Sequence, residues 1–248
     1  MQTTFTYCRL ALGLAAALAL AAGCSQVQST ALNSEGVRLY QAGNYQQAAD
    51  SFQRAIANDP KSATSYYNLA AALHKSGKLT NNPNDLAQAE RYYNQCLEYD
   101  PNHTECYRGL TVLLVETGRT DASFRLLEGW SARSPQLADP KIELARLLEE
   151  QNNSQLASAR LVEALSIDPN NPRALTALGR LREVQGDQQQ ALANYKRSLS
   201  VNQYQPEISA RVAALTAAGA GAGMPASPLA NPTPGTRTAD QWQSSVRY

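Results

Sequence analysis

The tripeptide Asp100-Pro101-Asn102 recurs as Asp168-Pro169-Asn170, and Asp59-Pro60-Lys61 nearly repeats it. Together with Pro135, these prolines stand at intervals of 41, 34 and 34 residues. Proline cannot continue an α-helix and biases the residue before it away from helical backbone angles, so each proline predicts the end of a helical stretch. The spacing indicates a repeat of about 34 residues, which is typical of stacked helical hairpins.

Other residues recur as well when each proline is placed at the same position of the repeat. A bulky residue followed by a small one lies in the first half, a glycine lies near the middle, and a small residue and an aromatic one lie in the second half. Two helices approach closely only where one carries small residues, and glycine ends a helix readily because it adopts the left-handed conformation at little cost. The recurring residues are Leu69-Ala70, Leu144-Ala145 and Leu178-Gly179; Gly43, Gly77, Gly118 and Gly186; Ala48, Ala89, Ala157 and Ala191; and Phe52, Tyr93 and Tyr195.

Residues 63–70, Ala-Thr-Ser-Tyr-Tyr-Asn-Leu-Ala, resemble the opening of the tetratricopeptide repeat consensus. The resemblance implies an all-α fold, a right-handed superhelix (α-solenoid) of about five helix hairpins and a capping helix. One hairpin cannot bury its own apolar face, so the hairpins must stack. We assign an array over residues 32–216, with units at 29–62, 63–103, 104–137, 138–171 and 172–205 and a capping helix at 206–216.

Two units depart from the pattern. The second is seven residues too long, and we place the excess, residues 78–84, in a turn between its two helices because this stretch is rich in turn residues. The third has Ser123, Leu127 and Trp130 at sites that favour alanine, an aromatic residue and alanine. Trp130 must therefore either enlarge the interface between helices or point outward.

Residues 1–23 predict an export signal. Arg9 precedes an unbroken run of Leu, Ala and Gly over residues 10–22. A run of this length forms a helix of roughly 20 Å, which is too short for a bilayer core of about 30 Å. A short apolar stretch with a basic flank and small residues at its end is typical of a signal peptide.

The end of that run, Leu20-Ala21-Ala22-Gly23-Cys24, resembles a bacterial lipobox. The resemblance implies cleavage before Cys24 and acylation of that cysteine, which gives stable membrane anchoring. The protein would then lie on the periplasmic side of the cell envelope, and Ser25 favours the outer membrane. Residues 24–31 would form a short tether. An ordinary cleaved signal with a cysteine nearby is the alternative.

The charge of the chain is balanced, with 22 basic and 21 acidic residues. Removal of residues 1–23 removes Arg9 alone, which leaves 21 of each. Nucleic-acid binding needs a concentrated basic surface, so this balance argues against a nucleic-acid partner.

The last segment, residues 217–248, differs in composition from the rest and is rich in Ala, Gly and Pro. Such a segment has too little apolar surface to offset the entropy lost on ordering, so we expect a disordered tail. A short docking motif around Trp242 is an alternative to an incidental chain end.

Candidate catalytic groups are few. His74 and His103 stand in no metal-ligand spacing with cysteines or carboxylates, and we expect both to be solvated. Glu149 and Glu150 are adjacent on a helix and diverge by about 100°, which suits a solvated face. The sequence has no nucleophile elbow, phosphate-binding loop or zinc motif. We therefore predict no catalytic residue, no metal, no cofactor and no small-molecule substrate.

Cys96 and Cys106 are the two cysteines beyond the export signal and the lipobox. Cys96 takes a small site late in the second unit, and Cys106 lies early in the third. Stacked units bring these helices together, so a disulfide is possible in an oxidising envelope. Two separate buried thiols that act as small apolar residues are the interpretation that we favour.

In the tetratricopeptide family the first helices of successive units line a concave groove that binds a protein or peptide. The groove here would mix Tyr, Arg, Ile and Val, which suits an extended or helical peptide held by apolar anchors and arginine contacts. Asn33 and Val37 stand where the family's carboxylate clamp carries Lys and Asn, so that clamp is not predicted. The alternative is that these are ordinary surface residues. By position, the groove residues are Asn33, Val37, Tyr67, Asn68, Ala71, His74, Arg108, Val112, Val115, Ile142, Arg146, Glu149, Thr176, Arg180 and Glu183.

These observations favour a non-catalytic scaffold that is anchored to the membrane and helps to assemble or stabilise an envelope complex. The chain resembles the outer-membrane lipoproteins built of these repeats, which include the pilotins of type IV pili and the Tad/Flp pilus assembly lipoprotein. A pilus or secretion apparatus is therefore the expected setting. The alternative is a regulatory or adaptor subunit of an envelope enzyme that builds or trims polysaccharide.

Overall fold

The computed structural model describes residues 26–220, and this part of the chain contains helices and no strand. The all-α class expected from the repeat is confirmed. The predicted export signal, Cys24 and all but the first four residues of the predicted tail lie outside the described residues. Within residues 26–220, no helix combines the length and the apolar composition that a membrane crossing requires.

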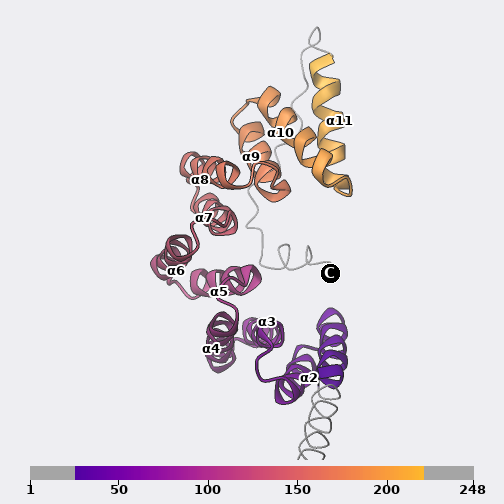
Figure 1. Cartoon of the computed structure of the whole chain (residues 1–248), viewed down its shortest axis with the longest axis vertical. Coiled ribbons are helices and arrows are strands. Elements are labelled where there is room, and N and C mark those ends of the chain that lie inside the picture. The colour runs from indigo at the N-terminus through magenta and orange to yellow at the C-terminus, as the bar shows by residue number, and fades with distance from the viewer. Residues whose placement is uncertain (1–25, 221–248) are drawn as a thin grey trace, which may run out of the picture. The chain divides into compact units, whose positions relative to one another are not determined.

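The helices group into two compact units that divide after Thr120, and Figure 1 labels them along the chain. Unit 1 contains a helix over residues 26–41, then α2 (Tyr45–Asn58), α3 (Ala63–Thr80), α4 (Pro83–Tyr99) and α5 (Thr104–Glu116). Unit 2 contains α6 (Thr120–Arg133), α7 (Asp139–Glu150), α8 (Ser154–Ile167), α9 (Pro172–Val184), α10 (Gln188–Val201) and α11 (Pro206–Ala220).

The recurring proline tripeptides form the links between hairpins. The Asp100 carboxylate accepts a hydrogen bond from the backbone N–H of Asn102 at 3.0 Å, and the Asp168 carboxylate accepts one from Asn170 at 3.3 Å. In unit 1 the next helix then holds the link in place, because the Tyr107 hydroxyl donates to the Pro101 carbonyl at 3.2 Å. The aspartate therefore closes a local turn, and the proline stops the preceding helix.

Close packing within each unit depends on an aromatic ring that faces a residue without a side chain. A Cβ atom on Gly109 would lie 2.6 Å from the ring of Tyr93, and one on Gly179 would lie 2.7 Å from the ring of Tyr195. Both rings are almost completely buried. The aromatic and small residues of the repeat thus fit one another across helices, as the repeat pattern predicts.

The long second hairpin differs from the prediction. Residues 78–80 continue α3 as a helix, Asn81 takes the left-handed conformation with φ 52°, and Pro83 begins α4. Gly77 is therefore not a turn residue but lies inside α3, where a Cβ atom would be 3.0 Å from Leu86 Cδ2 and from Asp85 Cβ. The excess residues lengthen the two helices instead of forming the turn that we expected.

Both ends of the described part also differ from the expected boundaries. Residues 26–31, which we assigned to a tether, are helical, and the Ser29 hydroxyl donates to the Ala55 carbonyl at 3.0 Å. At the other end α11 continues to Ala220, beyond the expected end at residue 216. Trp130 of α6 is fully buried, so it does not point outward into solvent.

Candidate protein-interaction face

The predicted groove residues lie on the helix over residues 26–41 and on α3, α5, α7 and α9, which are the first helices of the hairpins. Five of them are buried: Asn68, Ala71, His74, Ile142 and Arg146. The other ten are half-buried: Asn33, Val37, Tyr67, Arg108, Val112, Val115, Glu149, Thr176, Arg180 and Glu183. We call these positions the first-helix face and describe it separately for each unit.

In unit 1 the first-helix face is mainly apolar and aromatic. Val37, Ala71 and Val112 occupy the same position of three successive repeats, and the Tyr67 ring lies one turn before Ala71. The centroid of the Tyr67 ring is 6.3 Å from that of Tyr93 and 5.5 Å from that of His103. Half-buried side chains of this kind can serve as apolar anchor sites for a partner.

Two predicted site residues of unit 1 are paired with each other. The Asn68 side chain donates a hydrogen bond to the Asn33 side chain at 3.0 Å. This bond links α3 to the helix over residues 26–41. Both side-chain amides are therefore already engaged in a hydrogen bond within the chain.

His74 is buried, so the expectation of a solvated histidine is wrong here. Its Nε2 atom lies 2.9 Å from a carboxylate oxygen of Glu116, and its Nδ1 atom lies 3.4 Å from the Tyr93 hydroxyl. The Lys78 ammonium donates to the other Glu116 oxygen at 2.7 Å. The three-residue contact joins α3 to α5, which places His74 in the structural framework of unit 1.

Glu116 is held as a carboxylate by these partners. Partial burial opposes ionisation, but the hydrogen bonds and charges of His74 and Lys78 outweigh it and lower the pKa from 4.5 to about 2. The carboxylate is therefore committed to its two neighbours on α3 and is not a general base.

His103 also departs from the solvated prediction. Its Nδ1 atom accepts a hydrogen bond from the backbone N–H of Cys106 at 3.3 Å and so caps the start of α5. The same ring lies 3.4 Å from a carboxylate oxygen of Glu105, and only 13% of its side chain is exposed. The capping role explains why a histidine follows the Asp-Pro-Asn link.

In unit 2 the first-helix face is charged, and its charges are paired between helices of neighbouring hairpins. Arg180 of α9 donates to Glu149 of α7 at 2.6 Å, and Arg211 of α11 donates to Glu183 of α9. The Tyr195 hydroxyl also donates to Glu183 at 3.0 Å. Arg180 was predicted to contact a partner, but here it joins two hairpins of its own chain.

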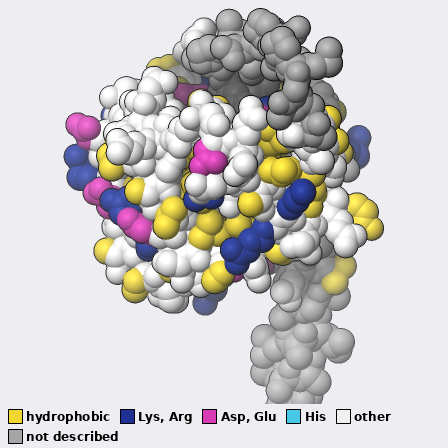
Figure 2. Space-filling model, turned by 90° about the horizontal axis from the view of Figure 1, so that it is seen from above, with side chains coloured by type: hydrophobic (Ala, Val, Ile, Leu, Met, Phe, Trp, Pro, Cys, Tyr) yellow, Lys and Arg dark blue, Asp and Glu magenta, His cyan; other side chains and the backbone are white. Residues whose placement is uncertain are grey.

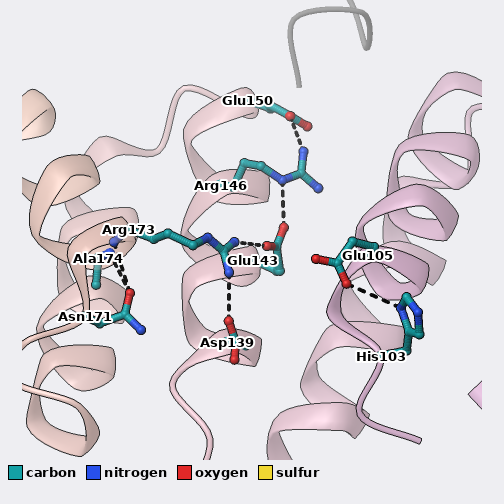
Figure 3. Close-up of polar contacts among 9 residues, drawn as sticks. All are labelled: His103, Glu105, Asp139, Glu143, Arg146, Glu150, Asn171, Arg173 and Ala174. Atoms are coloured by element: carbon teal, nitrogen blue, oxygen red, sulfur yellow. Dashed lines mark hydrogen bonds and ion pairs between the residues drawn. The ribbon is translucent and has the colours of Figure 1, made fainter. Parts of the chain in front are cut away.

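A second set of charges lies deeper in unit 2 (Figure 3). Glu143 of α7 is fully buried and accepts a hydrogen bond from Arg146 at 3.0 Å. Arg173 of α9 binds both Glu143 and Asp139, the latter at 2.7 Å, and Arg146 also donates to Glu150. Two guanidinium groups thus neutralise one buried carboxylate, and the cluster fastens α9 onto α7.

The remaining predicted site residue of unit 2 with a polar contact is Thr176. Its hydroxyl lies 2.8 Å from the Ser198 hydroxyl and donates to the Gln205 side chain at 3.2 Å. These contacts join α9 to α10 and to the link before α11. Partner contact by the fifteen residues therefore stays a prediction, while several of them already have a structural role.

Sequence reasoning missed the central role of Glu143. Its partner Arg173 lies thirty residues away in the sequence, and nothing in the local pattern marks a buried carboxylate. One local signal points to burial at this position. Glu143 directly precedes Leu144-Ala145, the bulky and small pair that packs closely in the first helix of its hairpin.

Cys96 and Cys106 form a disulfide, with their Cα atoms 6.6 Å apart. We favoured two separate buried thiols, and that prediction is wrong. The disulfide that we considered as the alternative is present. The bond joins the end of α4 to the first turn of α5, and both cysteines are fully buried beside Tyr66. It therefore fastens the second hairpin to the third within unit 1.

On the face of the described residues that Figure 2 presents, basic side chains lie among hydrophobic, acidic and uncharged ones. The expectation of no nucleic-acid partner stays a prediction that rests on the balanced charge of the chain.

Comparison with known protein families identifies the repeat. Models of the tetratricopeptide repeat match residues 36–77, 84–103 and 161–193. The chain carries tetratricopeptide repeats. Two of the matched ranges lie in unit 1 and one lies in unit 2.

Curated relatives share the repeats over only part of their own length. The human protein O-mannosyl-transferase TMTC1 is 26% identical over 176 residues, which cover 68% of this chain and 19% of the relative. The BBSome complex member BBS4 homolog of Drosophila melanogaster is 25% identical over 179 residues, which cover 70% of this chain and 36% of the relative. The chain thus spans about a fifth and about a third of the length of these two proteins.

Solved structures share the fold over most of the chain. A thermophilic tetratricopeptide protein of Thermus thermophilus matches with a TM-score of 0.56 at 22% identity, covering 76% of this chain and 99% of that one. PilF of Pseudomonas aeruginosa matches with a TM-score of 0.52 at 17% identity, covering 79% and 86%. PilW, a type IV pilus biogenesis factor, matches with a TM-score of 0.53 at 19% identity, covering 77% and 86%.

Proposed function

We propose that this chain is a non-catalytic scaffold, anchored to the cell envelope through Cys24, that holds a protein partner and so assists the assembly or stability of an envelope complex. The observation that carries the proposal is the apolar and aromatic first-helix face of unit 1, on hairpins of a repeat that holds proteins and peptides in other chains. Tyr67, Val112 and Val115 are half-buried there, and their exposed parts suit shallow apolar contact with a partner.

The chemistry of the face favours binding over catalysis. Most charged residues of the first-helix face are paired within the chain: Glu149 with Arg180, Glu183 with Arg211, and Arg146 with Glu143. His74 of the same face is paired with Glu116 of α5. A catalytic site needs polar groups that converge on a substrate, and paired groups are already satisfied. An apolar strip flanked by satisfied charges suits a peptide that buries a few hydrophobic side chains.

A pilus or related secretion apparatus is the setting that we favour. PilW, whose structure shares the fold, is described as a type IV pilus biogenesis factor. The lipobox-like residues 20–24 would place the chain on the same kind of membrane-bound machine.

The alternative is an adaptor subunit of an enzyme that acts on envelope polysaccharide. It is favoured by the relation to TMTC1, which is named as a mannosyl-transferase and carries the matched segment as about a fifth of its length. The two proposals differ in the partner: a pilus or secretion component in the first, and a cell-wall enzyme in the second.

A photo-crosslinking experiment in cells tests the scaffold proposal and identifies the partner. A photoreactive amino acid is placed at Val112 on the first-helix face and, as a matched control, at exposed Asn94 on the second helix α4. We expect a discrete crosslinked protein from position 112 and none from position 94. Equal crosslinking from both positions would contradict binding through the first-helix face, and mass spectrometry of the product decides between the two settings.

Membrane anchoring needs its own test. Cells are labelled with a palmitate analogue, and the wild-type chain is compared with the Cys24→Ser variant. We expect label and outer-membrane fractionation for the wild type and neither for the variant. A wild-type chain that carries no label would overturn the lipid anchor and leave the binding face untouched.

A further inference from the structure

Three residues of metal-binding types, two cysteines and a histidine, meet at the junction between α4 and α5. Cys96 lies near the end of α4, His103 directly precedes α5, and Cys106 lies in the first turn of α5. The two sulfur atoms and one ring nitrogen of His103 all lie within 4.8 Å of one another. Within residues 26–220, this is the one group of three His, Cys, Asp or Glu residues that meets that spacing.

We propose that the dithiol form of this junction binds one zinc ion through Cys96, His103 and Cys106. The inference is independent of the proposed function. The α4–α5 junction is then cross-linked in one of two ways. The disulfide links it in the oxidised chain, and the zinc ion links it in a chain that still carries the two thiols.

The geometry suits zinc. Tetrahedral zinc binds thiolate sulfur at about 2.3 Å and imidazole nitrogen at about 2.0–2.1 Å, which places its ligand atoms roughly 3.5–3.8 Å apart. The three atoms already lie within 4.8 Å, and the sulfurs must separate to van der Waals distance once the disulfide is absent. The Cα atoms of the cysteines are 6.6 Å apart, near the wide end of the disulfide range of about 4.4–6.8 Å, so this separation needs little movement of the helices.

The surroundings of the site favour a bound cation in the reduced state. Both cysteines are fully buried, and the His103 side chain, 13% exposed, is the route to solvent. A water molecule can complete the tetrahedron on that side, as in zinc sites with three protein ligands. The Glu105 carboxylate lies 3.4 Å from Nδ1 of His103 and adds negative charge beside a bound cation.

Zinc binding and disulfide formation each account for their protons and electrons. Zinc binding takes both thiols as thiolates and releases two protons to solvent. Closure of the disulfide by an external protein disulfide transfers two electrons from the two thiolates to that disulfide. The zinc ion leaves, the Cys96–Cys106 bond forms, and the external disulfide becomes two thiolates.

The test uses the full chain in detergent, with Cys8→Ser and Cys24→Ser substitutions so that Cys96 and Cys106 are the remaining cysteines. Because both sulfurs are buried, the chain is unfolded, reduced with a phosphine, and refolded without oxygen. Circular dichroism confirms that the helices have reformed. Zinc uptake is then measured against a chromogenic chelator, and Co²⁺ is used as a spectroscopic substitute.

Two variants separate ligation from structure. In His103→Asn the imidazole is lost while the helix cap is kept, because asparagine is a preferred N-cap residue. In Cys96→Ser with Cys106→Ser both thiolates are lost. We expect about one zinc ion per reduced chain, at least 10-fold weaker binding in His103→Asn, and none in the double serine variant or the oxidised chain.

The Co²⁺ form of the reduced chain should show sulfur-to-metal charge-transfer absorption that the double serine variant lacks. The proposal is overturned when the refolded reduced chain takes up no more zinc than the double serine variant. It is also overturned when His103→Asn binds zinc as tightly as the parent chain, because His103 is then no ligand.

Discussion

The two units use the same repeat position in different ways. At the centre of the first helix, unit 1 has Val37, Ala71 and Val112, and unit 2 has Arg146 and Arg180. In unit 1 successive hairpins are therefore held by apolar packing, one disulfide and the contact of His74 with Glu116. In unit 2 the first helices are joined by arginine–carboxylate pairs. The same hairpin thus tolerates either kind of link, and of the two described units it is unit 1 whose first-helix face is mainly apolar.

The largest effect is expected from Glu143→Gln in unit 2. The variant removes the charge of the fully buried carboxylate that Arg146 and Arg173 share, which leaves Arg146 with Glu150 and Arg173 with Asp139. Breaking a buried pair typically costs about 3–5 kcal/mol. Urea unfolding followed by circular dichroism measures the loss. As the control, Glu163→Gln breaks the exposed pair with Arg160 and should change the stability by no more than about 0.5 kcal/mol. Equal effects in the two variants would contradict a buried ionic link in unit 2.

Loss of the disulfide should have the next largest effect, and it should act on unit 1. The bond closes a loop with a sequence separation of 10 residues, for which chain-entropy reasoning gives about 2–3 kcal/mol. Unfolding of the Cys96→Ala, Cys106→Ala variant, compared with the oxidised parent in the presence of a chelator, measures it. Hydrogen exchange should rise in α4 and α5 and stay unchanged in α9 and α10. A rise in both units would show that the effect of the disulfide is not confined to unit 1.

Glu116 of unit 1 and Glu150 of unit 2 should change stability in opposite directions as the pH falls. The pKa of Glu116 is lowered from 4.5 to about 2, so its contribution to stability is complete above pH 4.5 and disappears as the pH falls through about 2. In unit 2 burial raises the pKa of Glu150 against the opposing effect of Arg146, so that carboxylate costs stability at neutral pH and the cost is relieved on acidification.

Two matched variants, Glu116→Gln and Glu150→Gln, separate these effects in unfolding titrations from about pH 7 down to about pH 2, the lowered pKa of Glu116. Glu116→Gln should be less stable than the parent at neutral pH, and the difference should vanish at the acid end. Glu150→Gln should show no such loss at neutral pH. Parallel pH curves for the parent and Glu116→Gln would mean that Glu116 titrates normally in the folded chain.

The smallest effect is expected from Arg180→Gln on the first-helix face of unit 2. Its pair with Glu149 is partly exposed, with 31% and 27% of the side chains accessible, and such pairs contribute about 0.2–1 kcal/mol. Thermal unfolding at low and high salt measures the change, which should shrink as salt rises. A loss above about 2 kcal/mol, well beyond the range for such a pair, would mean that it, and not the Glu143 cluster, holds α9 to α7.

The helical class and the period of the repeat could be predicted because their signals are local. A proline, the aspartate before it and the N-cap after it all act within a few residues, as at Asp100 and Pro101. The all-α class followed from that period. The long second hairpin was predicted wrongly because Asn81 replaces glycine as the residue in the left-handed conformation, and Gly77 serves close packing against Leu86 instead.

The candidate site was harder to predict because its contacts join residues far apart in the sequence. His74 and Glu116 are 42 residues apart, and Arg173 and Glu143 are 30 apart. A family position can state which helix face a residue occupies, but it cannot state whether a neighbouring hairpin supplies the opposite charge. For that reason both histidines were expected to be solvated, and the pair of Arg180 with Glu149 was not predicted.

The lengthened helix α3 breaks the equivalence of the hairpins. It has 18 residues where α5 has 13, so at 1.5 Å per residue it is about 7.5 Å longer. Lys78, in the added turn, binds Glu116 of α5, and Leu79 beside it is 64% exposed. Within unit 1 the first helices carry similar apolar positions, so a bound peptide could take more than one register along them. The extra turn of α3 has no counterpart on α5. A partner that contacts this turn would therefore bind in one register only.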